Sequence, residues 1–111
     1  MNEAIVLSRK VLDDLVRKIV EVSKPLRIIL FGSAGRGKMK PNSDIDILVV
    51  VRDGMHRRRT AQAIYRRLFG FGMAKDIVVA TESDVREHGD NPALVIRSAL
   101  RNGRELYRAS R

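Results

Sequence analysis

Three aspartates stand at positions that an ordinary apolar core would not accept. Asp44 and Asp46 open a stretch that continues as the apolar run 47–51, and Asp76 opens a second apolar run, Ile77–Ala80. Alternate side chains of an extended strand share a face, so Asp44 and Asp46 lie on one face about 7 Å apart. Two unpartnered carboxylates in an apolar setting repel each other and cost several kcal/mol. A divalent cation would remove that conflict, so the pattern predicts a metal site.

A glycine-rich segment, residues 32–37, precedes the first two aspartates and adds a second kind of chemistry. Glycine lets the backbone approach a phosphate closely, and N–H groups at the start of a following helical turn favour an anion. Ser33 adds a hydroxyl donor, while Arg36 and Lys38 add positive charge. Because Mg²⁺ binds one or two carboxylates together with substrate phosphates, the combination predicts a site for a metal-bound nucleoside triphosphate.

The elements that must position these residues follow from the spacing of apolar side chains. The sequence predicts strands over Arg27–Phe31, Asp44–Val51 and Lys75–Ala80, and a short edge strand at Glu105–Tyr107. It predicts helices over 3–23 and about 56–69, and a last helix that begins at Pro92 after the cap Asp90-Asn91 and is ended by Gly103. This order indicates an α/β (α+β) fold, a small mixed β-sheet flanked by helices. We expect residues 1–111 to form a single domain.

The predicted topology brings the chemistry-bearing residues to one edge of the sheet. The second and third strands are joined by a helical crossover, so they should run parallel and begin at the same edge. Asp44, Asp46 and Asp76 then lie together at that edge. If the first strand pairs antiparallel with the second, Gly32 and Ser33 reach the same edge.

Composition narrows the class of protein. The chain has 111 residues and a net charge of +9, with no cysteine, which excludes a disulfide framework and a cysteine nucleophile. No apolar stretch approaches the ~20 residues that a bilayer span needs, and no secretory signal is visible, so we expect a cytoplasmic domain without membrane contact. The charge invites a nucleic-acid partner. Because only 5% of residues are aromatic and Tyr65, Phe69 and Phe71 are expected in the core, we place nucleic acid last among the partners.

The motif resembles the signature of a known superfamily. Gly32-Ser33, ten intervening residues and Asp44-Ile45-Asp46 are similar to the pattern of the DNA polymerase β-like nucleotidyltransferases. Within that superfamily, the short chain and the sequence of residues 32–37 resemble the minimal nucleotidyltransferases. The resemblance extends to about Tyr107, and Gly35 departs from the alanine that is common in the family. It implies the palm-like nucleotidyltransferase fold of polymerase β.

The resemblance also implies residue roles in a two-metal nucleotidyl transfer. Its three aspartates would be the catalytic residues and the ligands of two Mg²⁺ ions: Asp44, Asp46 and Asp76. Asp76 would also help to deprotonate the attacking hydroxyl. Gly32 and Ser33 would bind the β- and γ-phosphates of ATP or another nucleoside triphosphate, and Arg36 is a candidate phosphate contact.

The acceptor implied by the resemblance is a protein. Family members of this size often lie beside a helical HEPN-family toxin, and some act as its antitoxin by adding AMP to it. This implies transfer of AMP to a hydroxyl of a HEPN-family partner, and it leaves a homo-oligomer open. One alternative is a non-catalytic antitoxin with a vestigial metal site. Another is transfer to RNA or to a small molecule, although the chain has no obvious module for gripping a primer or tRNA.

An arginine run gives a hypothesis about that partner. Arg57, Arg58 and Arg59 begin a predicted helix, where cations oppose the helix macrodipole by up to ~1 kcal/mol. We expect an acidic partner or a bound anion to compensate them, with solvated arginines at a later helix start as the simpler alternative.

Overall fold

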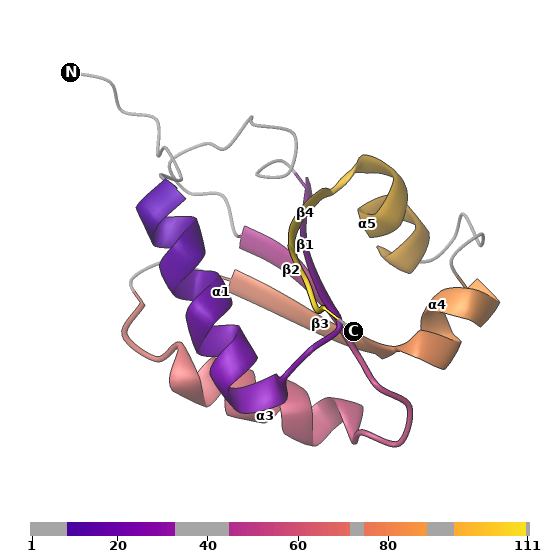
Figure 1. Ribbon diagram of the computed structural model, residues 1–111, viewed down its shortest axis with the longest axis horizontal. Helices are drawn as coiled ribbons and strands as arrows, with labels where there is room; N and C mark the ends of the chain where they lie inside the picture. Colours follow the sequence, from indigo (N-terminus) through magenta and orange to yellow (C-terminus); the bar gives the residue numbers. More distant parts are fainter. Residues whose placement is uncertain (1–8, 33–44, 72–74, 89–94, 111) are drawn as a thin grey trace.

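A mixed β-sheet forms the centre of the computed structural model, which describes residues 9–32, 45–71, 75–88 and 95–110. Four strands pair in the order β3-β2-β1-β4 (Figure 1). Their bounds are β1 (Arg27–Phe31), β2 (Ile45–Val51), β3 (Lys75–Thr81) and β4 (Arg104–Arg108). β1 is antiparallel to both of its neighbours, β2 and β4, whereas β2 and β3 run parallel. The predicted mixed sheet and the predicted parallel pairing of β2 with β3 are confirmed. The antiparallel pairing of β1 with β2, on which the placement of Gly32 depended, is present.

Helices cover both faces of this sheet (Figure 1). They are α1 (Arg9–Ser23), α3 (Arg57–Arg67), α4 (Glu82–His88) and α5 (Val95–Asn102). α1 and α3 pack on one face, where their buried residues join Ile47 and Val49 of β2 in one core cluster. α4 and α5 lie on the other face, where Val85 and Ala99 pack with Leu48. The predicted α/β class, a small sheet flanked by helices, is confirmed.

Strict alternation along β2 explains why its sequence is apolar on both faces. Ile45, Ile47 and Val49 point toward α1 and α3, and Leu48 and Val50 point toward α4 and α5. Each of these five side chains is at most 3% exposed. A strand covered on both sides needs apolar residues at every position. Asp46, two residues before Leu48, therefore lies on the α4/α5 face at the point where β2 begins.

The first helix ends as the sequence predicts. Its buried stripe is Leu12, Leu15 and Ile19, the spacing of one helical face. Ser23 is buried and its hydroxyl donates to the carbonyl of Ile19 at 2.8 Å. Lys24 then adopts a left-handed conformation with φ of 43°, and its N–H donates to the carbonyl of Val20 at 3.0 Å. The predicted helix 3–23 agrees over residues 9–23, and its first six residues lie outside the described part.

One predicted helix is shorter than expected, β3 extends one residue beyond its predicted end to Thr81, and one helix was not predicted. The helix expected over 56–69 begins after its N-cap His56 and ends at Arg67. α4 was not predicted, although Thr81 and Asp84 form a reciprocal capping box: Thr81 N–H donates to Asp84 Oδ2, and Asp84 N–H donates to Thr81 Oγ1. The predicted start of the last helix, Pro92, lies outside the described residues. None of the described helices has the length and hydropathy of a membrane span.

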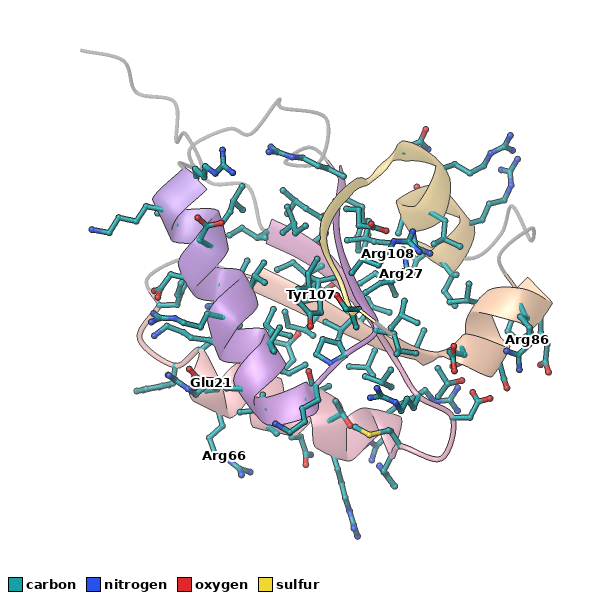
Figure 2. All side chains as sticks on the ribbon, in the orientation of Figure 1. Glu21, Arg27, Arg66, Arg86, Tyr107 and Arg108 are labelled. Atoms are coloured by element: carbon teal, nitrogen blue, oxygen red, sulfur yellow. The ribbon has the colours of Figure 1, made fainter. Side chains whose placement is uncertain are left out.

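The edge strand expected at Glu105–Tyr107 is present as part of β4. Glu105 accepts hydrogen bonds from the Nε atoms of Arg108 and Arg27, each at 2.9 Å, and the two arginines lie side by side in Figure 2. Arg108, and then Arg27, hold the pKa of Glu105 below its ordinary value. β4 pairs with β1 on the side away from β2, so both β1 and β2 are interior strands.

Candidate active site

Asp46 and Asp76 are direct neighbours across the parallel pair of β2 and β3. Their Cα positions are register partners, and adjacent strands are about 4.8 Å apart. Register partners share a face, so both carboxylates belong to the α4/α5 face. Asp46 is half-buried, and Asp76 is exposed. The convergence of these two aspartates, predicted from the topology, is confirmed.

Gly32 is the third residue that the structure brings to this site. It directly follows Phe31, the register partner of Asp46 on β1. Gly32 has a φ of 70°, a conformation that glycine adopts without steric cost. A Cβ placed on Gly32 would collide with Oδ2 of Asp46. The residue type therefore serves both the backbone turn and the space that the Asp46 carboxylate occupies.

The remaining predicted site residues lie outside the described part of the chain. These are Ser33, Arg36, Lys38 and Asp44, all within residues 33–44. In the described ranges, no three His, Cys, Asp or Glu side chains group closely enough to hold a metal ion. Asp46 and Asp76 are two of the three predicted ligands, and the structure brings these two together with Gly32.

The donor chemistry of this pair fits a divalent cation. Like charges placed directly opposite each other on adjacent strands destabilise a sheet. Asp46 and Asp76 are each the second residue of a strand. The residues that follow them are largely apolar, with Ile47 and Ile77 buried directly after them. Carboxylate oxygens are the protein ligands that Mg²⁺ prefers, usually one or two per ion with the rest from water and phosphate. A bound Mg²⁺ would offset the repulsion that the register imposes.

Tyr65 of α3 adds a group that the sequence did not predict for the site. Its hydroxyl oxygen accepts a hydrogen bond from the N–H of Ile77 at 2.8 Å and lies 3.4 Å from Oδ1 of Asp76. The side chain is 41% exposed, so the expectation that it belongs to the core is wrong. Helical periodicity could not predict this role, because Tyr65 is next to Ile64 of the buried stripe. The contact also depends on β3 being an edge strand, which the periodicity of α3 does not show.

The two other aromatic side chains expected in the core, Phe69 and Phe71, divide between surface and core. Phe69 is 92% exposed, contrary to the core position expected from the sequence. Phe71 packs partly against the core cluster of α1 and α3, as expected, and the ammonium of Lys75 lies 5.9 Å from its ring centre. Phe69 and Phe71 line a groove of about 900 Å³ between α1 and the end of α3, and neither Asp46 nor Asp76 lines it.

The arginine run of α3 lies at the opposite end of the sheet. α3 follows the carboxyl end of β2, whereas Asp46 is near its beginning. Arg57 pairs with Asp84 at 2.7 Å, so a carboxylate of this chain compensates the first arginine. Arg58 and Arg59 are exposed, and the first turn of α3 has no acidic residue. The backbone N–H of Arg59 donates to Nδ1 of His56 at 3.2 Å, which caps the helix.

Most of the chain matches one protein-family model. The family model described as "Nucleotidyltransferase domain" matches residues 9–106. A bifunctional uridylyltransferase/uridylyl-removing enzyme of Burkholderia thailandensis is 39% identical over 82 residues, which are 72% of this chain and 9% of that protein. The chain thus spans less than a tenth of the length of this curated relative.

Two solved structures share the fold. The toxin-antitoxin MntA-HepT aligns with a TM-score of 0.62 and 17% identity, covering 92% of this chain and 74% of that chain. A toxin-antitoxin structure with AMP-PNP aligns with a TM-score of 0.60 and 23% identity, covering 88% and 74%. At these identities, the similarity establishes a common fold.

Proposed function

Because this chain belongs to the nucleotidyltransferase domain family, we propose that it transfers AMP from ATP to a hydroxyl group of a partner protein. The observation that supports this most directly is the register pairing of Asp46 with Asp76, beside a glycine that leaves room for the Asp46 carboxylate. In a nucleotidyltransferase, such a pair of carboxylates binds the metal ions, and the metal ions bind the triphosphate.

The proposal assigns each site residue a task. The three aspartates would hold two Mg²⁺ ions, which when bound supply positive charge to the reacting phosphate and its leaving group: Asp44, Asp46 and Asp76. The backbone at Gly32 and the hydroxyl of Ser33 would bind the β- and γ-phosphates, and Arg36 would neutralise part of their charge. Asp76 would accept the proton of the attacking hydroxyl. The acceptor oxygen then bonds to the α-phosphorus as the bond to pyrophosphate breaks.

We propose a HEPN-family toxin as the acceptor, with this chain as its antitoxin. The support is the family resemblance, together with the fold shared with the MntA-HepT toxin-antitoxin and with a toxin-antitoxin structure containing AMP-PNP. A nucleoside-triphosphate substrate is also consistent with the cytoplasmic location expected from the sequence. The uridylyltransferase relative makes UTP the first donor to compare with ATP.

A labelling experiment tests donor and acceptor together. The protein is incubated with Mg²⁺, the product of the adjacent gene and each of the four α-labelled nucleoside triphosphates in turn. We expect label on the partner with ATP, and none with the Asp44→Asn variant. Neutralisation of the partner that survives Asp44→Asn, without label, would instead favour a non-catalytic antitoxin. Extension of an RNA 3′ end without labelled protein would favour the RNA alternative.

A further inference from the structure

Tyr65 connects α3 to the free side of β3 in the described sheet. β3 stands at the end of the strand order, so the N–H groups on its outer side have no neighbouring strand to bind. The Tyr65 hydroxyl accepts one of them, that of Ile77, at 2.8 Å. This bond fixes the position of the hydroxyl oxygen relative to the β3 backbone.

The same hydroxyl reaches the carboxylate of the preceding residue. Its oxygen lies 3.4 Å from Oδ1 of Asp76. A phenol has one proton to donate, and because the oxygen accepts from Ile77, this proton is available for Asp76. Tyr65 thus holds Oδ1 from one side and leaves the other carboxylate oxygen, Oδ2, for a ligand.

We propose that Tyr65 is a positioning residue that orients the Asp76 carboxylate for metal binding. This inference rests on the proposed function, since it assigns Asp76 to the metal site. Asp76 is exposed, so packing against core residues does not fix the orientation of its side chain. Hydrogen bonds to ligating carboxylates are the usual means of fixing such groups, and their removal commonly costs about ten- to a hundredfold in metal affinity or activity.

The second tyrosine of the chain provides a matched control. Tyr107 on β4 packs against the core cluster on the α1 side of the sheet, and Figure 2 shows it between α1 and the strands. Tyr65→Phe and Tyr107→Phe remove the same hydroxyl group from the same residue type. Only the first substitution removes a contact with Asp76.

The test measures Mn²⁺ binding in the absence of any acceptor. Free Mn²⁺ is followed by electron paramagnetic resonance in titrations of the wild type, Tyr65→Phe, Tyr107→Phe and Asp76→Asn, after thermal melts have checked that each variant is folded. We expect Tyr65→Phe to weaken Mn²⁺ binding about tenfold, in the direction of Asp76→Asn, and Tyr107→Phe to match the wild type. Equal affinities for the wild type and Tyr65→Phe would overturn the inference, as would a wild type that binds no Mn²⁺.

A second readout separates this inference from the proposed function. In the transfer assay, Tyr65→Phe should lower kcat and raise the Mg²⁺ concentration needed for half-maximal rate, with the KM for nucleotide unchanged. Label found on Tyr65 itself would overturn the inference, because Tyr65 would then be an acceptor. A wild type that transfers no nucleotide to any acceptor, while the Mn²⁺ result stands, contradicts the proposed function and leaves the positioning role supported.

Discussion

The carboxylate of Asp46 occupies the space in which a side chain on Gly32 would begin. Gly32 directly follows β1, and Asp46 lies near the start of β2. The contact therefore joins two segments that are neighbours in an antiparallel strand pair. The left-handed φ of Gly32, 70°, would also be strained in any other residue. The absence of a side chain on Gly32 therefore leaves Oδ2 of Asp46 in its present position.

Gly32→Ala should lower the transfer rate about a hundredfold while the protein remains folded. The new Cβ would displace Oδ2 of Asp46, and a displacement of about 1 Å in a catalytic group can cost about a hundredfold in rate. The left-handed backbone adds about 1–2 kcal/mol of strain. Initial transfer rates and urea unfolding of the variant measure the two effects.

Gly54→Ala is the matched control for this substitution. Gly54 also has a left-handed φ, 94°, and a Cβ there meets nothing within 4 Å. Its unfolding free energy should fall by a similar ~1–2 kcal/mol with the transfer rate per folded molecule unchanged. Equal losses of rate in the two variants would show that backbone strain, and not the Asp46 contact, accounts for the effect.

Stability should depend on the ionisation of Asp84 under acidic conditions. The N–H of Thr81, and next the Arg57 guanidinium, hold the pKa of Asp84 below its usual 3.8. A carboxyl whose pKa is lower in the folded state stabilises the fold at any pH above 3.8, and this contribution is lost as the pH falls through the folded value. Asp84→Ala should cost about 1–2 kcal/mol at pH 7.

Urea unfolding at pH 7, 5 and 3 checks the pH dependence. The difference between wild type and Asp84→Ala should be constant from pH 7 to 5 and shrink at pH 3. Asp13→Ala, which changes an exposed aspartate on α1, should follow the wild type throughout. A difference that grows on acidification would mean that the sign of the pKa change is wrong.

Substituting Arg58 and Arg59 by glutamate should weaken the partner complex without slowing the chemical step. Both arginines are exposed at the start of α3, at the opposite end of the sheet from Asp46 and Asp76. Arg57 is left in place because it pairs with Asp84. Because acidic residues suit a helix N-terminus, the double variant should also gain a few tenths to ~1 kcal/mol of stability.

Calorimetry with the partner at several salt concentrations, together with kcat, tests this hypothesis. The affinity of the wild type should fall as salt rises, and that of the variant should be lower and less salt-dependent. If the double variant binds the partner at low salt as tightly as the wild type does, Arg58 and Arg59 are not part of the interface. A lower kcat at saturating partner would instead indicate an effect on the distant catalytic edge.

Much of the fold was predictable because its signals are local and repetitive. The apolar run of β2 indicates an interior strand, and the helical crossover to β3 requires a parallel pair. These two inferences alone bring Asp46 and Asp76 to one edge. The first strand, Arg27–Phe31, matches its predicted bounds because Pro25 and Gly32 punctuate both ends.

The unpredicted features depend on contacts that are distant in sequence or on weak local signals. α4 has no fully buried residue, so hydrophobic periodicity gives no indication of it, and only the Thr81–Asp84 capping box marks its start. Tyr65 and Phe69 lie near the end of α3. Aromatic residues occur both on the surface and in the core, so the residue type alone does not predict their exposure. The contact of Tyr65 with Asp76 requires knowledge of which strand forms the sheet edge.

The rate of nucleotidyl transfer in aspartate variants tests the central claim most directly. Initial rates from α-labelled ATP to the partner are measured for the wild type, Asp46→Asn, Asp76→Asn and Asp13→Asn, with melting curves for each. We expect Asp46→Asn and Asp76→Asn each to lose about a thousandfold in rate, and Asp13→Asn to keep the wild-type rate. Transfer that persists at the wild-type rate in folded Asp46→Asn and Asp76→Asn would contradict the assignment of this sheet edge as the active site.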